Sequence, residues 1–121
     1  MLINLSNHPL STWSELQIEA AKEQFSDIVD LQFPAIDPAA DETEIERLAD
    51  IFLNEIMQIS EKLATKPVVH LMGEYSFSYA LTNRLKLAGI EVVVSTSMRQ
   101  SEMNFDGTKT IRFDFVRFRK Y

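Results

Sequence analysis

Two histidines are the side chains of this sequence best suited to proton transfer near neutral pH. His8 stands in a polar turn, Ser6-Asn7-His8-Pro9, directly after the apolar segment 1–5. There it can donate to a phosphate or act as an acid or base, or it can bond to the backbone of its own turn, and its position favours neither role. His70 lies inside the apolar segment 68–72, which favours a packed, hydrogen-bonded core histidine over a catalytic one.

Two further motifs offer contacts to an anion. Gly73-Glu74 joins an apolar segment to a helix start, where unpaired backbone amides attract negative charge and glycine admits a ligand. The carboxylate of Glu74 would repel a phosphate and instead suits a ribose hydroxyl or a base edge. Ser95-Thr96-Ser97 offers three adjacent hydroxyls with Arg99 two residues on, a combination that suits a phosphodiester. The structural alternatives are a tight turn with Ser76 as helix cap, and a strand that continues into a hairpin.

The composition excludes other kinds of site. The chain has no cysteine, which rules out disulfides, thiolate metal sites, iron–sulfur clusters and a cysteine nucleophile. It has three glycines and none of the G-x-G-x-x-G, Walker A or G-x-S-x-G motifs, which excludes the usual dinucleotide and phosphate loops. Because the acidic residues fall mainly on expected helices rather than beside the motifs above, we expect no metal and no cofactor.

Charge and hydropathy indicate which partners to expect. Residues 1–65 hold 3 Lys/Arg and 13 Asp/Glu, whereas residues 66–121 hold 9 and 5. The acidic half opposes binding to duplex nucleic acid, and the basic half suits a small anionic ligand. No apolar run approaches the roughly 20 residues of a membrane helix, and the N-terminus lacks the apolar core of a signal peptide. We therefore predict a cytoplasmic protein without a membrane partner.

Alternating strand and helix patterns supply the frame for these motifs. Apolar runs predict strands at residues 1–5, 28–31, 68–72 and 90–94, and helical spacing predicts helices over 13–25, 41–66 and 77–88. Thr12 and Glu15 fit a capping box at the start of the first helix. We expect this helix to bury Leu16, Ala20, Ala21 and Phe25. Asp106-Gly107 predicts a hairpin between residues 98–105 and 109–121.

This order of elements predicts a single α/β domain over residues 1–121. The expected architecture is a Rossmann-like parallel sheet of about four strands in the order 2-1-3-4, with helices on both faces and a C-terminal β-hairpin. In such sheets ligands bind beyond the carboxyl ends of the strands, where the strand order reverses. Here that crevice would lie between the turns at Asn7-His8 and Gly73-Glu74, with residues 95–97 beside them.

Four segments, taken in order, resemble one known family. They are Ser6-Asn7-His8-Pro9-Leu10-Ser11, Met72-Gly73-Glu74, Ser95-Thr96-Ser97-Met98-Arg99 and Phe115-Val116-Arg117-Phe118-Arg119-Lys120-Tyr121. The chain is similar in these segments to the small stand-alone CRISPR-associated proteins related to the CARF fold, some of which are ring nucleases. The likeness spans nearly the whole chain, and its C-terminal segment is the most specific. Met72 stands where the family has a polar residue.

The resemblance implies a homodimer that binds and cleaves a cyclic oligoadenylate, a second messenger of type III CRISPR defence, without a metal. The ribose 2′-hydroxyl of the substrate would attack the adjacent phosphorus and leave a 2′,3′-cyclic phosphate. His8 would then be the acid, base or phosphate donor and Arg99 would stabilise charge, while the remaining contacts to the ligand would come from Ser6, Asn7, Gly73, Glu74, Ser95, Thr96 and Ser97. The alternatives are a non-catalytic sensor or sponge for the same messenger, and an interaction subunit whose acidic helix meets a protein.

Overall fold

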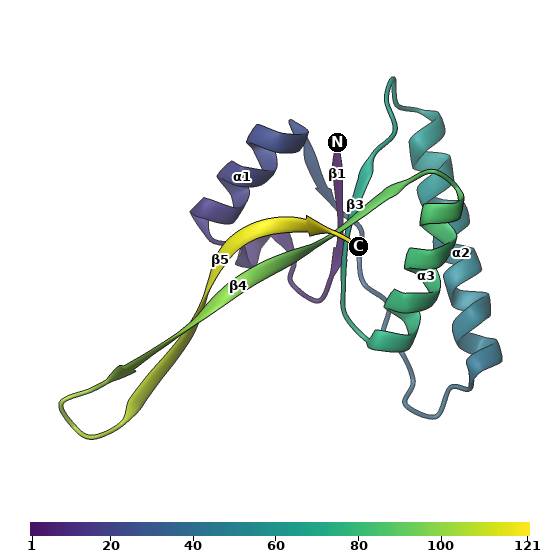
Figure 1. Ribbon diagram of the computed structural model, residues 1–121. Helices are drawn as coiled ribbons and strands as arrows, with labels where there is room; N and C mark the ends of the chain where they lie inside the picture. Colours follow the sequence, from purple (N-terminus) through teal and green to yellow (C-terminus); the bar gives the residue numbers. More distant parts are fainter.

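The computed structural model describes residues 1–121 as one mixed α/β domain with a five-stranded sheet (Figure 1). Its elements, in chain order, are β1 Leu2–Ser6, the short 3-10 helix η1 Leu10–Thr12, α1 Glu15–Phe25, β2 Ile28–Asp30, α2 Glu42–Glu61, β3 Val68–Met72, α3 Tyr75–Leu87, β4 Glu91–Met103 and β5 Lys109–Lys120. The strand order is β2-β1-β3-β4-β5. Strands β2, β1, β3 and β4 are parallel, which confirms the predicted order 2-1-3-4.

The strand count and the hairpin need correction. Segments 90–94 and 98–105 were expected as separate strands, but they belong to the single strand β4, and β5 pairs with it antiparallel from Val93 to Met103. The sheet therefore has five strands rather than four. No glycine or proline interrupts the chain between Glu91 and Met103, so the backbone continues extended through the hydroxyl residues.

Alternate residues of the central strands face opposite layers. Ile3, Leu5, Val69 and Leu71 join α2 and α3 in a cluster of 14 buried apolar residues. Leu2 instead belongs to a smaller cluster of 5, with Trp13 and Ala21 on the side of α1. Helices thus cover both faces of the sheet, α1 on one and α2 with α3 on the other (Figure 1). None of the helices combines the length and the apolar character needed to cross a lipid bilayer.

Helix α1 starts later than expected and covers little of its face of the sheet. Ser14, not Thr12, caps α1, because its side chain accepts from the Gln17 amide, whereas the Thr12 hydroxyl donates to the Pro9 carbonyl. The prediction that α1 buries Leu16 is wrong, since that side chain is 59% exposed, and Ala21 is the one fully buried residue of the helix. The α1 face of the sheet is therefore left open at the strand ends.

Beyond Ser97, β4 and β5 leave the body as a two-stranded arm, residues 98–114, visible in Figure 1 as the hairpin that projects past α1. Cross-strand partners share a face of such a ribbon. One face carries Arg99, Met103, Ile111 and Phe113. The other carries Arg112, which forms salt bridges with Glu102 and Asp114. The arm is amphipathic, and its apolar face is exposed.

Candidate functional site

A cavity of about 320 Å³ opens on the α1 face of the sheet, where the parallel strands end. Its lining comes from five parts of the chain, namely His8 after β1, the segment Thr12, Trp13, Ser14 and Gln17, His70 and Met72 of β3, Ser95, Thr96 and Ser97 of β4, and Phe113 and Phe115 of β5. Two of the predicted groups therefore meet here, the histidine turn and the hydroxyl run. No aspartate or glutamate lines the cavity, and nowhere do three His, Asp or Glu side chains gather as a metal site would require.

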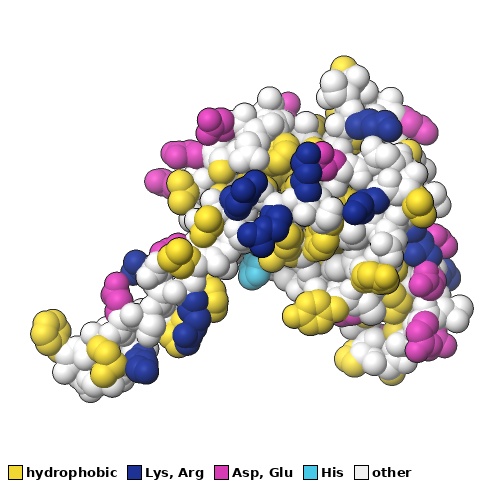
Figure 2. All heavy atoms as spheres, viewed as in Figure 1, with side chains coloured by type: hydrophobic (Ala, Val, Ile, Leu, Met, Phe, Trp, Pro, Cys, Tyr) yellow, Lys and Arg dark blue, Asp and Glu magenta, His cyan; other side chains and the backbone are white.

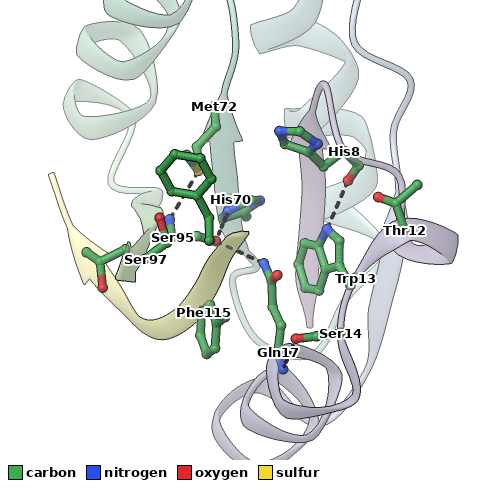
Figure 3. A pocket seen from close by; sticks show the side chains of 12 residues that line it. His8, Thr12, Trp13, Ser14, Gln17, His70, Met72, Ser95, Ser97 and Phe115 are labelled. Carbon is green, nitrogen blue, oxygen red and sulfur yellow. Dashed lines mark hydrogen bonds between the residues drawn. The ribbon is translucent and has the colours of Figure 1, made fainter. Parts of the chain in front are cut away.

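The turn after β1 is built to present His8. Its backbone carbonyl accepts from Asn4 Nδ2 and from Trp13 Nε1, each at 2.9 Å. These two donors hold the main chain, while the imidazole itself has no hydrogen-bond partner and lies at the cavity (Figure 3). The alternative in which the side chain bonds to its own turn does not occur. The ring is free to contact a ligand.

His70 is the hydrogen-bonded core histidine that the sequence favours, and it also lines the cavity. Its side chain is buried, with Nδ1 2.8 Å from Asn4 Oδ1 and Nε2 2.6 Å from Ser95 Oγ. Trp13 packs edge-on against this imidazole, with 5.2 Å between the ring centroids. Desolvation, and to a smaller extent the nearby His8, lowers the pKa of His70 to about 4, so the imidazole is neutral at pH 7.

The hydroxyl run sits where β4 parts from β3. The two strands pair only as far as Val93, so the Ser95 amide donates to Met72 Sδ, at 3.2 Å, instead of to a carbonyl. The Ser95 hydroxyl also accepts from Gln17 Nε2 at 3.0 Å. A β-bulge lies between Thr96 and Ser97, and the Thr96 hydroxyl bonds to the backbone of β5. Ser95 lies two residues after Val93, which packs on the α1 side, so strand alternation points its hydroxyl to the face of the cavity.

Arg99 lies outside the cavity lining, on the arm. It pairs directly with Phe113, a lining residue, so both side chains leave the same face of the ribbon. The guanidinium is exposed and forms no salt bridge, unlike that of Arg112 on the opposite face. Arg99 is a rim residue rather than a wall of the site.

The structure does not bring Gly73 and Glu74 into this cavity, which corrects the expected anion site at the start of α3. The Glu74 carboxylate caps the helix by accepting from the Ser76 and Phe77 amides, so those donors are already used. A Cβ atom at Gly73 would collide with the ring of Phe33. This glycine makes room for a packed side chain, not for a ligand.

Ser6 and Asn7 also lie apart from the cavity of His8. Their side chains line an adjoining hollow of about 540 Å³ that includes Asp30. The Ser6 hydroxyl donates to Asn4 Oδ1 at 2.8 Å, and the Asn7 amide extends the pairing of β1 by donating to Met72 O. Both residues shape the turn that presents His8.

Several lining residues were missed from the sequence. Trp13 reads as the start of a helix, Gln17 as a solvent-facing helix residue, and Phe113 and Phe115 as packing positions of a hairpin. Asn4, which bonds to His70 but does not line the cavity, does carry a signal, because it is a polar residue inside an otherwise apolar strand. Figure 3 shows Gln17 of α1 and Phe115 of β5 converging on the cavity from elements distant in the chain.

The fold and the cavity define a mixed α/β domain with an open polar site at the ends of its parallel strands. The chain belongs to the family described as Uncharacterized protein MJ1673 family, whose model matches residues 1–119. That description names neither a ligand nor a reaction. A search among curated proteins gave no match.

Proposed function

We propose that this protein binds a cyclic oligoadenylate in the cavity of His8 and opens its ring without a metal. The observation that carries the proposal is the free His8 imidazole, presented beside hydroxyl groups and aromatic rings in a cavity at the strand ends. Hydroxyls and an imidazole suit phosphodiester oxygens, and Phe113 and Phe115 offer faces on which adenine can stack. The similarity of four segments to CARF-related CRISPR proteins points to the same ligand.

Ring opening needs only groups that the ligand and this chain supply. The ribose 2′-oxygen forms a bond to the adjacent phosphorus, and the bond from phosphorus to the 5′-oxygen breaks. The product carries a 2′,3′-cyclic phosphate and a 5′-hydroxyl. His8 moves a proton in this step, while Ser97 and the rim residue Arg99 contact the phosphate and stabilise its developing charge. Holding the 2′-oxygen in line with the leaving oxygen supplies a further part of the rate.

The proposed assembly is a homodimer. A cyclic messenger has rotational symmetry, which a two-fold pair of cavities matches. The exposed apolar face of the arm is continuous with the cavity through Phe113, so a second copy seated there would enclose the ligand and bury that face. Exposed Lys and Arg side chains gather where the arm joins the body, over β5, while acidic ones lie over the helices (Figure 2). The cations of β5 that pair with the part of β4 before the arm are Arg117, Arg119 and Lys120, opposite Thr96, Val94 and Val93.

A non-catalytic sensor or sponge for the same messenger is the second candidate. It is favoured by the position of Arg99 on the rim and by the absence of Gly73 and Glu74 from the cavity. With those groups displaced, the site keeps its contacts for binding but has fewer groups that stabilise a transition state.

The test is to incubate the purified protein with cyclic tri-, tetra- and hexa-adenylate in EDTA and to separate the products by chromatography. We expect linear products ending in a 2′,3′-cyclic phosphate, with no effect of the chelator. Tight binding without product would support the sensor, whereas neither binding nor cleavage of any ring would contradict both. Light scattering tests the dimer, and a monomeric mass with and without ligand would contradict it.

A further inference from the structure

Behind the cavity surface, three side chains from three parallel strands form one hydrogen-bonded line. Ser95 Oγ of β4 lies 2.6 Å from Nε2 of His70 in β3, and Nδ1 of the same ring lies 2.8 Å from Oδ1 of Asn4 in β1. Figure 3 shows the Ser95 end of this line at the cavity. Asn4 and His70 are each 1% exposed, so the line runs from the open cavity into the sheet.

The hydrogen bonds of Asn4 determine which nitrogen of His70 carries the proton. Its Nδ2 group donates to His8 O and to Asp30 Oδ1, both at 2.9 Å, so the amide oxygen must face the imidazole. That oxygen can only accept, hence the neutral ring is protonated at Nδ1 and bare at Nε2. The Ser95 hydroxyl therefore donates to Nε2. An asparagine turned the other way would give the opposite tautomer and no acceptor for the serine.

We propose that Ser95 is a nucleophile, with His70 as its general base and Asn4 as the residue that orients the imidazole, and that the site takes a small carboxylic ester. The arrangement has the roles of a Ser-His-Asn triad, in which Asp30 holds the asparagine amide. This activity is separate from ring opening and requires nothing of His8.

The reaction balances with ester and water alone. Ser95 Oγ bonds to the carbonyl carbon as its proton passes to His70 Nε2. The bond from carbon to the alcohol oxygen then breaks, and that oxygen takes the proton from the imidazolium. Water attacks the acyl-serine in the same way and releases a carboxylic acid, which restores Ser95. Gln17 Nε2 donates to Ser95 Oγ at 3.0 Å in the free site, and on attack this amide can turn to the adjacent oxyanion.

The lining of the cavity sets the substrate class. Trp13, Phe113 and Phe115 form apolar walls, and no carboxylate faces the serine. A compact ester with a flat apolar group fits a space of about 320 Å³. Burial keeps His70 uncharged at pH 7, with a pKa of about 4, and the negative charge of the oxyanion then stabilises the imidazolium as it forms.

A small fluorophosphonate tests the nucleophile directly, since attack on phosphorus expels fluoride and leaves a stable serine adduct. Peptide mass spectrometry should place the adduct on Ser95, and Ser95→Ala should abolish it. Ser101→Ala, which removes an exposed serine of the arm, should label like the unchanged protein. His70→Asn should slow labelling by about 10²-fold, the usual contribution of a general base. With p-nitrophenyl acetate, the unchanged protein should release nitrophenol and Ser95→Ala should not.

A cysteine variant tests the role of His70 without replacing His70 itself, so it does not depend on whether His70→Asn folds. The chain has no cysteine, so Ser95→Cys and Ser101→Cys each carry a single thiol. The rate of reaction with iodoacetamide should rise with pH as each thiol ionises. For Ser95→Cys, beside His70, the pH of half-maximal rate should lie well below the ordinary thiol pKa of about 8.5, whereas Ser101→Cys should show the ordinary value. Adding Asn4→Ala to Ser95→Cys should raise that midpoint toward the Ser101→Cys value. An unlabelled Ser95, or a Ser95→Cys thiol that titrates like the arm thiol, overturns the proposal.

Discussion

The two faces of the sheet come from alternating residues of the same strands, yet their chemistry is opposite. Toward α2 and α3, the strands present Ile3, Leu5 and Leu71 to a continuous apolar core. Toward α1, the same strands present Asn4 and His70, joined in one hydrogen-bonded chain. Because successive side chains of a strand point to opposite faces, a five-residue strand contributes residues both to the core and to the candidate site.

The covering helices explain why only one face holds a site. Helix α2 has 20 residues and buries four of them, whereas α1 has 11 and buries one. The larger helix seals its face, and the smaller one leaves the carboxyl ends of β1, β3 and β4 open. The comparison teaches that most of the buried apolar residues lie on the α2 side, whereas the α1 side combines a smaller apolar cluster with polar groups near solvent.

The largest effect is expected on the apolar face. Leu71→Asp would put a carboxylate among the α2 and α3 side chains, where an unpaired buried charge costs several kcal/mol. Since a whole domain is stable by only about 5–15 kcal/mol, the variant should not fold. Soluble yield and far-UV circular dichroism measure this. The matched change is Val116→Asp at a 54% exposed strand position, which should fold normally. A stable Leu71→Asp would disprove the strand assignment.

On the polar face, a change should alter chemistry and spare the fold. His8→Ala should slow ring opening by roughly 10²–10⁴-fold if the imidazole transfers a proton, with binding changed by no more than a few-fold. Its ring makes no hydrogen bond, so the thermal midpoint should stay near that of the unchanged protein. Product chromatography under single turnover gives the rate. Cleavage at the original rate would reduce His8 to a turn residue.

Burial of His70 should make stability fall with acid. The unfolded chain binds a proton near pH 6.5, but the folded ring does so only near its pKa of about 4. The unfolded state therefore gains protons first, and stability should decline by up to about 3 kcal/mol as pH falls from 6.5 to 4. Urea unfolding at several pH values measures it. His70→Asn should lose this part of the pH dependence. Parallel curves for both proteins would show that folding does not lower the pKa of the His70 ring.

The parts of the fold that were predictable rest on local pattern. Val68 to Met72 is an apolar run without alternation, and it forms the central strand with parallel neighbours. The helix cap was not predictable in this way, because Thr12 and Ser14 are both good caps and only the tertiary turn decides between them. The alternative in which Ser95-Thr96-Ser97 continues the strand into the hairpin is confirmed, because pairing with β5 holds this polar segment extended.

The same distinction between local pattern and tertiary contacts applies to the residues of the candidate site. The topology rule for parallel sheets placed His8 and the hydroxyl run together, since both follow strands that end at one edge. The rule failed for Gly73 because Phe33, 40 positions earlier, fills the space above it. Gln17 and Phe113 reach the cavity through the docking of α1 and the twist of the arm, which no local spacing encodes.

The smallest effect is expected at the rim, where the two faces of the arm offer a matched pair of arginines. Arg99→Ala removes an unpaired guanidinium beside Phe113 and should weaken binding of a cyclic oligoadenylate by about 1.5–3 kcal/mol, the usual worth of a charged hydrogen bond. Arg112→Ala removes the same charge from the opposite face, where Glu102 and Asp114 already pair it, and should leave binding unchanged. Calorimetry with the ring that binds most tightly separates the two. Equal losses would mean that the arm attracts the ligand by net charge alone, so that the face bearing Phe113 has no part in recognition.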